Sequence, residues 1–121
     1  MICLSFDIEE FELPQEHGYD MPFERMMEIS RYGTNVILDT MQKHGVKGTF
    51  FVTVNFAEHA PDETARIVNE GHELASHGMN HTVFKPEDLF ASRLMLEQLI
   101  NLPFLGYRMS AGVALSQILC R

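Results

Sequence analysis

Two histidines and two carboxylates have the residue types and the spacing of a metal site. His77 and His81 stand four residues apart, and Asp7 and Glu9 stand two apart after the apolar run 2–6. On a straight strand the two histidines would be ~13 Å apart, whereas on a helical turn both imidazoles could reach one ion. Side chains two apart on a strand leave on the same face. One carboxylate could therefore bind the ion while the other accepts a proton.

The chemistry that fits this group is metal-assisted hydrolysis. Two imidazoles and a carboxylate leave one coordination position open for water, and a bound divalent ion lowers the pKa of that water toward neutrality. Asp7 could take the proton from the water, and Arg108 is the cation expected to hold Asp7 ionised and oriented. The remaining histidines are expected at the surface or as hydrogen-bonded core residues: His17, His44, His59 and His72.

Alternating strands and helices are predicted to position these residues. The strands are expected at 2–6, 48–54, 73–76 and 104–108, and the helices at 30–44, 61–70 and 86–101. This order predicts parallel strands joined by right-handed crossovers, with the site residues just past the carboxyl ends of the strands. The strand at 48–54 has no polar alternation and should be covered on both faces. Cys3 should be buried in the first strand.

Composition limits the classes of function. With 121 residues the chain is one domain at most, about half the usual length of an α/β barrel. The net charge of −8 argues against a sequence-independent grip on nucleic acid, and no apolar run is long enough for a membrane helix. Cys3 and Cys120 lack the spacing of a disulfide framework, so a reducing compartment and a cytoplasmic location are expected.

Four successive motifs resemble those of the polysaccharide deacetylases of the NodB-homology type. They are SFD at 5–7, GTFF at 48–51, GHELASH at 71–77 followed by His81, and GYR at 106–108. The resemblance covers residues 1–109, a partial NodB-like domain, and leaves 110–121 as an atypical tail. It implies an α/β fold, the N-terminal half of a distorted barrel. It also implies a divalent ion, zinc before cobalt or nickel, and removal of N-acetyl or O-acetyl groups from a carbohydrate.

Carried over by position, the resemblance makes Asp7 the catalytic base, His77 and His81 metal ligands, and Arg108 the residue that tethers Asp7. The commoner pattern has a second aspartate directly after the first, where this chain has Ile8. Glu9 is therefore the expected metal ligand, by analogy with the branch that spaces its acids as D-x-D. Glu10 is kept as the alternative.

Two other functions stay open. One is an amidohydrolase of the same fold that opens a small cyclic amide or ureide, as an allantoinase does. The other is a truncated, inactive domain that binds metal or sugar, because the family supplies its catalytic histidine acid later in the domain. The chain also has Met109, Ser110 and Ala111 where the family usually has Pro and Tyr in a loop that contacts the substrate. Half a barrel would leave strand edges open, so a homo-oligomer is also expected.

Overall fold

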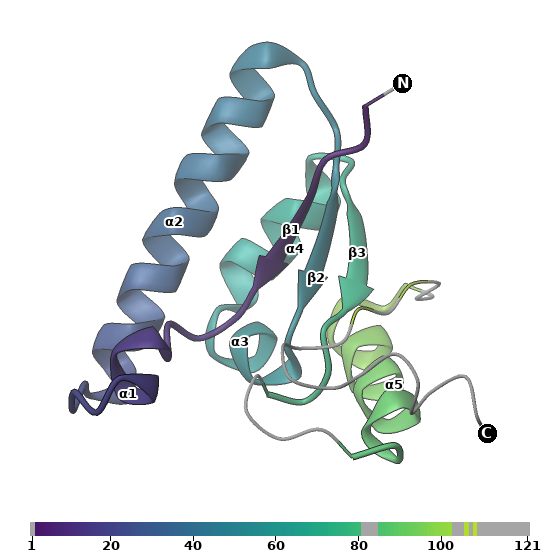
Figure 1. Cartoon of the computed structure of the whole chain (residues 1–121). Coiled ribbons are helices and arrows are strands. Elements are labelled where there is room, and N and C mark those ends of the chain that lie inside the picture. The colour runs from purple at the N-terminus through teal and green to yellow at the C-terminus, as the bar shows by residue number, and fades with distance from the viewer. Residues whose placement is uncertain (1, 81–84, 103–105, 107, 109–121) are drawn as a thin grey trace.

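Three parallel strands form the sheet at the centre of the chain. The computed structural model describes residues 2–80, 85–102, 106 and 108. The strands β1 (Ser5–Ile8), β2 (Thr49–Val52) and β3 (Glu73–Ser76) lie in the order β1-β2-β3, and Asp7 pairs with Phe51, which pairs with Ala75. All three strands point the same way, toward the end of the sheet where α1 and α3 lie (Figure 1). The predicted parallel arrangement is confirmed.

Helices connect and cover these strands. They are α1 (Leu13–Glu16), α2 (Phe23–His44), α3 (Val54–His59), α4 (Pro61–Asn69) and α5 (Asp88–Ile100). In Figure 1, α2 lies on the β1 side of the sheet, and α5 lies near the end of β3. Among the described residues, no helix has both the length and the apolar character needed to cross a bilayer.

The helices bury one face of the sheet. Phe50 and Val52 of β2 have no exposed surface, and they pack in one core with side chains from all the longer helices. Burying each such side chain stabilises the fold by about 1.5–3 kcal/mol relative to leaving it exposed. That core includes Leu38, Met41, Phe56, Ile67, Leu74 and Leu96. The methionines of α2 are packing residues, since Met26, Met27 and Met41 are all buried.

The other face of the sheet is only partly covered in the described part of the chain. Residues of β2 alternate between buried and half-buried, and Phe51 and Thr49 are on the half-buried face. The prediction that this strand is covered on both faces is therefore wrong for these residues. The physical reason is the charge on this face: Asp7 of β1 and Arg108 lie here and form an ion pair that is still partly exposed.

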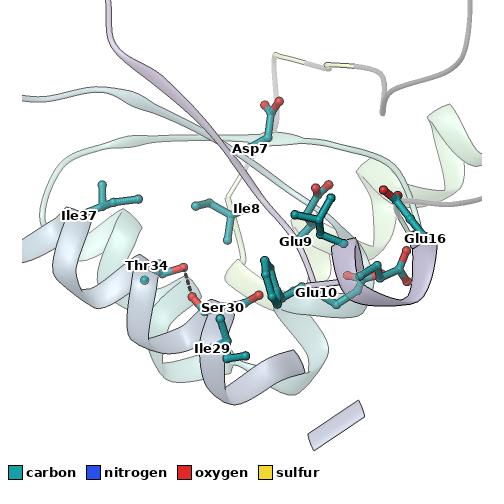
Figure 2. Close-up of a pocket in the computed structure, with 13 residues that line it drawn as sticks. Asp7, Ile8, Glu9, Glu10, Glu16, Ile29, Ser30, Thr34 and Ile37 are labelled. Atoms are coloured by element: carbon teal, nitrogen blue, oxygen red, sulfur yellow. Dashed lines mark hydrogen bonds between the residues drawn. The ribbon is translucent and has the colours of Figure 1, made fainter. Parts of the chain in front are cut away.

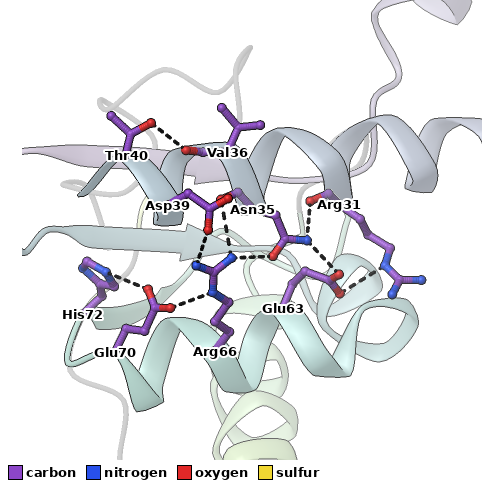
Figure 3. Close-up of polar contacts among 9 residues, drawn as sticks. All are labelled: Arg31, Asn35, Val36, Asp39, Thr40, Glu63, Arg66, Glu70 and His72. Atoms are coloured by element: carbon purple, nitrogen blue, oxygen red, sulfur yellow. Dashed lines mark hydrogen bonds and ion pairs between the residues drawn. The ribbon is translucent and has the colours of Figure 1, made fainter. Parts of the chain in front are cut away.

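A polar network joins α2 to α4 (Figure 3). The buried carboxylate of Glu63 accepts hydrogen bonds from Arg31 Nε and Asn35 Nδ2, each at 3.1 Å. Arg66 donates to Asp39 at 2.6 Å and to Glu70 at 2.7 Å. These contacts set the position of the long helix α2 against the helix that leads into β3.

Several predicted boundaries need correction. The first strand begins at Ser5 rather than Ile2, so Cys3 is exposed and not buried as predicted. Helix α2 begins at Phe23 rather than Ser30. The predicted strand 48–54 ends at Val52, and Val54 begins α3, which was not predicted.

Other elements are confirmed. The third strand has the predicted bounds, and Gly45 ends α2 in the left-handed conformation at φ +63°. Most of the predicted strand 104–108 and all of the tail 110–121 lie outside the described residues. Two positions of the predicted strand, 106 and 108, are described. The Gly106 carbonyl accepts a hydrogen bond from Ser76 N at 3.0 Å, and Arg108 N donates to Ser76 O at 2.8 Å. These bonds place residues 106 and 108 beside the end of β3.

Candidate functional site

β1 and β3 bring an acidic segment and a histidine to the same end of the sheet. Asp7 lies within β1, and not just past its end as predicted, whereas Glu9 directly follows the strand. Asp7 and Glu9 project from one side of the chain and Ile8 from the other (Figure 2), as expected for residues two apart. His77 follows β3, and its backbone amide continues the ladder by donating to Val52 O at 2.9 Å.

Arg108 is held over this end of the sheet by three contacts. Its Nη1 donates to Asp7 Oδ1 at 2.9 Å, and its Nη2 donates to Ser5 Oγ at 2.7 Å. Its guanidinium carbon lies 4.1 Å from the centre of the Phe51 ring, a cation–π distance. The planar fork of the guanidinium thus fixes the carboxylate of Asp7 in direction as well as in charge. Arg108 and Asp7 are therefore in contact, as the sequence predicted, although their catalytic roles stay predictions.

His77 is buried, and its two ring nitrogens face a backbone carbonyl and a carboxylate. Nδ1 donates to the backbone carbonyl of Arg108 at 2.8 Å, and Nε2 lies 3.2 Å from Glu9 Oε2. Burial by itself would lower the pKa of His77, but the hydrogen bond with Glu9 and the negative charge of Asp7 outweigh it and raise the pKa above 6.5. The imidazole is therefore fixed in orientation, with Nε2 turned toward a carboxylate.

The two candidate acids after β1 point to different places. Glu9 faces His77, whereas Glu10 is turned into the protein, where its Oε2 accepts a hydrogen bond from Thr53 Oγ1 at 3.0 Å. Only 1 % of the Glu10 surface is exposed. Glu9 is thus the acid beside His77 in this structure. The role of Glu10 as an alternative ligand is not supported by its position.

The segment after His77 does not form the helical turn expected from the histidine spacing. Gly78 has φ +97°, and the carbonyls of Gly78 and Met79 accept hydrogen bonds from Val54 N and Asn55 N, each at 2.9 Å. The expectation of a helical turn is wrong for residues 77–80 because their carbonyls bond to α3 rather than within the segment. His81 lies outside the described residues. Within the described ranges no three His, Cys, Asp or Glu side chains form a group able to hold an ion.

A cavity of about 470 Å³ adjoins the site, between the segment after β1 and helix α2. Its apolar wall includes Ile8, Ile29 and Ile37 (Figure 2). Five carboxylates line it and, among the described residues, no Lys, Arg or His does: Asp7, Glu9, Glu10, Glu12 and Glu16. This cavity was not predicted from the sequence. The short helix α1, which folds this acidic segment back, was not predicted either.

The fold and this site define an α/β protein with acid, histidine and arginine side chains gathered at the carboxyl end of a parallel sheet. A sequence profile described as polysaccharide deacetylase matches residues 17–99, and the chain belongs to this family. The expected α/β fold, the N-terminal part of the deacetylase barrel, is confirmed by the solved structures of the family.

Relatives and solved structures agree with this assignment. The chain is 46% identical over 73 residues to an uncharacterized 30.6 kDa protein of Geobacillus stearothermophilus, covering 60% of the chain and 24% of that protein. It is 42% identical over 48 residues to the peptidoglycan-N-acetylmuramic acid deacetylase PdaA of Bacillus subtilis, covering 40% and 18%. The structure of the Bc1960 peptidoglycan N-acetylglucosamine deacetylase superposes with a TM-score of 0.66 at 28% identity, covering 95% of this chain and 48% of that one. The chain thus corresponds to less than half the length of these proteins.

Proposed function

We propose that the chain carries part of the active site of a metal-dependent deacetylase that removes N-acetyl groups from an oligosaccharide or polysaccharide. The observation that carries the proposal is the arrangement of His77, whose Nδ1 is held by a backbone carbonyl while Nε2 faces Glu9. A histidine that binds a metal commonly has its second nitrogen fixed in this way. The names of the relatives, peptidoglycan and chitooligosaccharide deacetylases, support the substrate class.

The donor set fits a zinc ion, with cobalt or nickel as substitutes. Two ligands at ~2.0–2.1 Å from one tetrahedral ion stand about 3.3–3.4 Å apart, and the 3.2 Å between His77 Nε2 and Glu9 Oε2 is close to that separation. Imidazole nitrogen and carboxylate oxygen are both ordinary zinc ligands. His81 is proposed as the third ligand from its sequence position. The ion would supply Lewis acidity and a water of lowered pKa.

The chain's own residues would then orient the substrate and move one proton. Asp7, turned by Arg108 and Ser5, is proposed to accept the proton of the attacking water. Water adds to the acetyl carbonyl carbon, and the bond from that carbon to the sugar nitrogen breaks as the nitrogen takes up the proton that Asp7 accepted. The products are acetate and a free amine. The adjoining cavity offers carboxylates as acceptors for sugar hydroxyls and an apolar wall for the ring.

Acetate release tests this function directly. The zinc-loaded protein should release acetate from N-acetylated chitooligosaccharides or peptidoglycan fragments, and Asp7→Asn should lower the rate by about 10²–10⁴-fold. Asp20→Asn changes an exposed acid of the following loop and serves as the matched control. A protein that binds zinc but releases no acetate would contradict the proposal and favour an inactive metal- or sugar-binding domain.

Allantoin and related cyclic ureides provide the comparison substrate. The relatives named above are deacetylases, so the cyclic-amide alternative is not favoured. Faster turnover of the ureide than of any acetylated saccharide would favour the cyclic-amide alternative over deacetylation.

A further inference from the structure

Two segments that carry the candidate ligands meet at the start of α3. The backbone amide of Thr53 donates to the carbonyl oxygen of Ile8 at 3.1 Å, and Ile8 is the residue before Glu9. The next two amides, those of Val54 and Asn55, donate to Gly78 O and Met79 O, each at 2.9 Å. Three consecutive amides therefore connect the acidic segment to the histidine segment.

The side chain of Thr53 adds a fourth connection. Its hydroxyl donates to Glu10 Oε2 at 3.0 Å and accepts from Phe56 N at 3.1 Å, which makes Thr53 the N-cap of α3. Thr53 is fully buried and Glu10 almost so, and in the described part of the chain Glu10 Oε1 is buried without a hydrogen-bond partner. A buried carboxylate that lost the Thr53 bond would be left without a compensating hydrogen bond on either oxygen, which is unfavourable.

The residues that contact one another in this way flank the proposed metal pair. Glu9 lies between Ile8 and Glu10, both of which are bonded to Thr53. Two backbone hydrogen bonds hold His77. Its own amide donates to Val52 O, and the carbonyl of the next residue, Gly78, accepts from Val54 N. The position of Glu9 relative to His77 is therefore set by the junction between β2 and α3.

We infer that Thr53 and Glu10 are positioning residues that fix Glu9 against His77 for ion binding. This inference rests on the proposed function only in naming a metal as the ligand of that pair. Glu10 acts through Thr53 and α3, and it does not itself face His77. The buried hydroxyl of Thr53 bonds to both the acidic segment and the first turn of the helix.

Zinc affinity of point variants tests the inference. Thr53→Val keeps the shape of the side chain and removes its hydroxyl, and we expect it to weaken zinc binding by about 10–100-fold, as loss of an outer-sphere partner does. Thr53→Ser restores the hydroxyl and should bind zinc within about threefold of wild type. Glu10→Gln keeps an acceptor oxygen and should lose less affinity than Glu10→Ala.

Thr64 is also a buried threonine, and its hydroxyl donates to Ala60 O at 2.9 Å at the start of α4. Thr64→Val is therefore the matched control. It should lower the thermal midpoint and leave zinc affinity unchanged. The inference is wrong if Thr53→Val binds zinc as wild type does, or if Thr64→Val weakens binding equally.

Amide hydrogen exchange provides a second readout that needs no metal. Thr53→Val should speed exchange at Val54 and Asn55 by about tenfold more than Thr64→Val does, because these amides close the junction on the histidine segment. If wild type takes up no zinc, the proposed metal is wrong, and exchange alone decides on the junction. Equal exchange at these two amides in both valine variants would overturn the inference.

Discussion

At the scale of single residues, the arginine fork is the feature that most narrowly defines the site. Arg108 contacts Asp7 and Ser5 with different nitrogens of the same plane and stacks on Phe51. A lysine would retain the charge but would lose the planar fork that bonds to Asp7 and Ser5 while it stacks on Phe51. Charge and geometry can therefore be separated by one substitution.

Arg108→Lys should change function more than stability. The Asp7–Arg108 pair is about 40% exposed on each side, so the free energy of unfolding should change by less than about 1 kcal/mol. Acetate release should fall about tenfold or more, because Asp7 loses its fixed direction. Urea unfolding and acetate assays measure the two effects. The control Arg25→Lys, at an exposed ion pair with Glu28, should change neither the free energy of unfolding nor acetate release. Full activity in Arg108→Lys would show that Asp7 needs only a nearby charge.

His72 should make stability depend on pH. Burial, reinforced by the positive charge of Lys47, lowers the pKa of His72 below 6.5. Its Nδ1 accepts a hydrogen bond from Gly48 N at 3.2 Å, which requires the neutral ring. Below about pH 6.5 the unfolded chain binds a proton that the folded chain resists, so the free energy of unfolding falls as pH drops, by at most about 1.4 kcal/mol per pH unit.

Chemical denaturation between about pH 5 and 8 measures this effect as a difference between variants. His72→Gln should remove the contribution below pH 6.5, while His44→Gln, at an exposed histidine, should keep it. Parallel curves for wild type and His72→Gln would show that His72 does not titrate differently on folding.

At the scale of elements, two glycines of the same long helix should respond in opposite directions. Gly45 ends α2 at φ +63°, a conformation that costs a non-glycine residue about 1–2 kcal/mol. Gly33 lies inside α2, and a Cβ there would meet no atom within 4 Å. Gly45→Ala should lower the free energy of unfolding by about 1 kcal/mol, and Gly33→Ala should raise it by about 0.5–1 kcal/mol. Equal signs in thermal unfolding would contradict the assigned helix end.

The network between α2 and α4 should be worth more than an exposed pair. Glu63 is buried and accepts from both Arg31 and Asn35, so Glu63→Ala should cost about 1–3 kcal/mol in urea unfolding. Glu28→Ala removes another helix glutamate paired with an arginine, at an exposed position, and should cost less than about 0.5 kcal/mol. Similar losses in the two variants would mean that burial of Glu63 does not matter.

The elements differ in how far the sequence predicts them. The third strand and the end of α2 follow from local signals, namely a short apolar run and a glycine after the basic pair Lys43 and His44. The start of α3 was missed because the run 48–54 continues in β-favouring residues, although Thr53 is a good N-cap and bonds to Phe56 N.

The contacts of the site also differ in how far the sequence predicts them. The contact of Asp7 with Arg108, 101 residues apart, was expected because both residues were predicted at the carboxyl end of one parallel sheet. The bond from Thr53 to Glu10 has no signal in the sequence, because it depends on how α3 packs against the segment after β1.

At the scale of the whole molecule, β1 has one described strand neighbour, β2, and one face of the sheet is only partly covered. Paired or covered edges are the rule in stable sheets, so the prediction of a homo-oligomer stands. Light scattering of the purified chain should give a dimer or larger species. A monodisperse monomer with a sharp thermal transition would show that the chain closes its own core.

Zinc titration of the purified chain tests whether Glu9, His77 and His81 hold an ion, on which the proposed chemistry depends. We expect about one ion per chain, with binding weakened by about 100-fold in His77→Ala, and unchanged in His17→Ala, an exposed histidine outside the site. Failure of wild type to take up zinc, cobalt or nickel, or equal binding by wild type and His77→Ala, would rule out the proposed metal site.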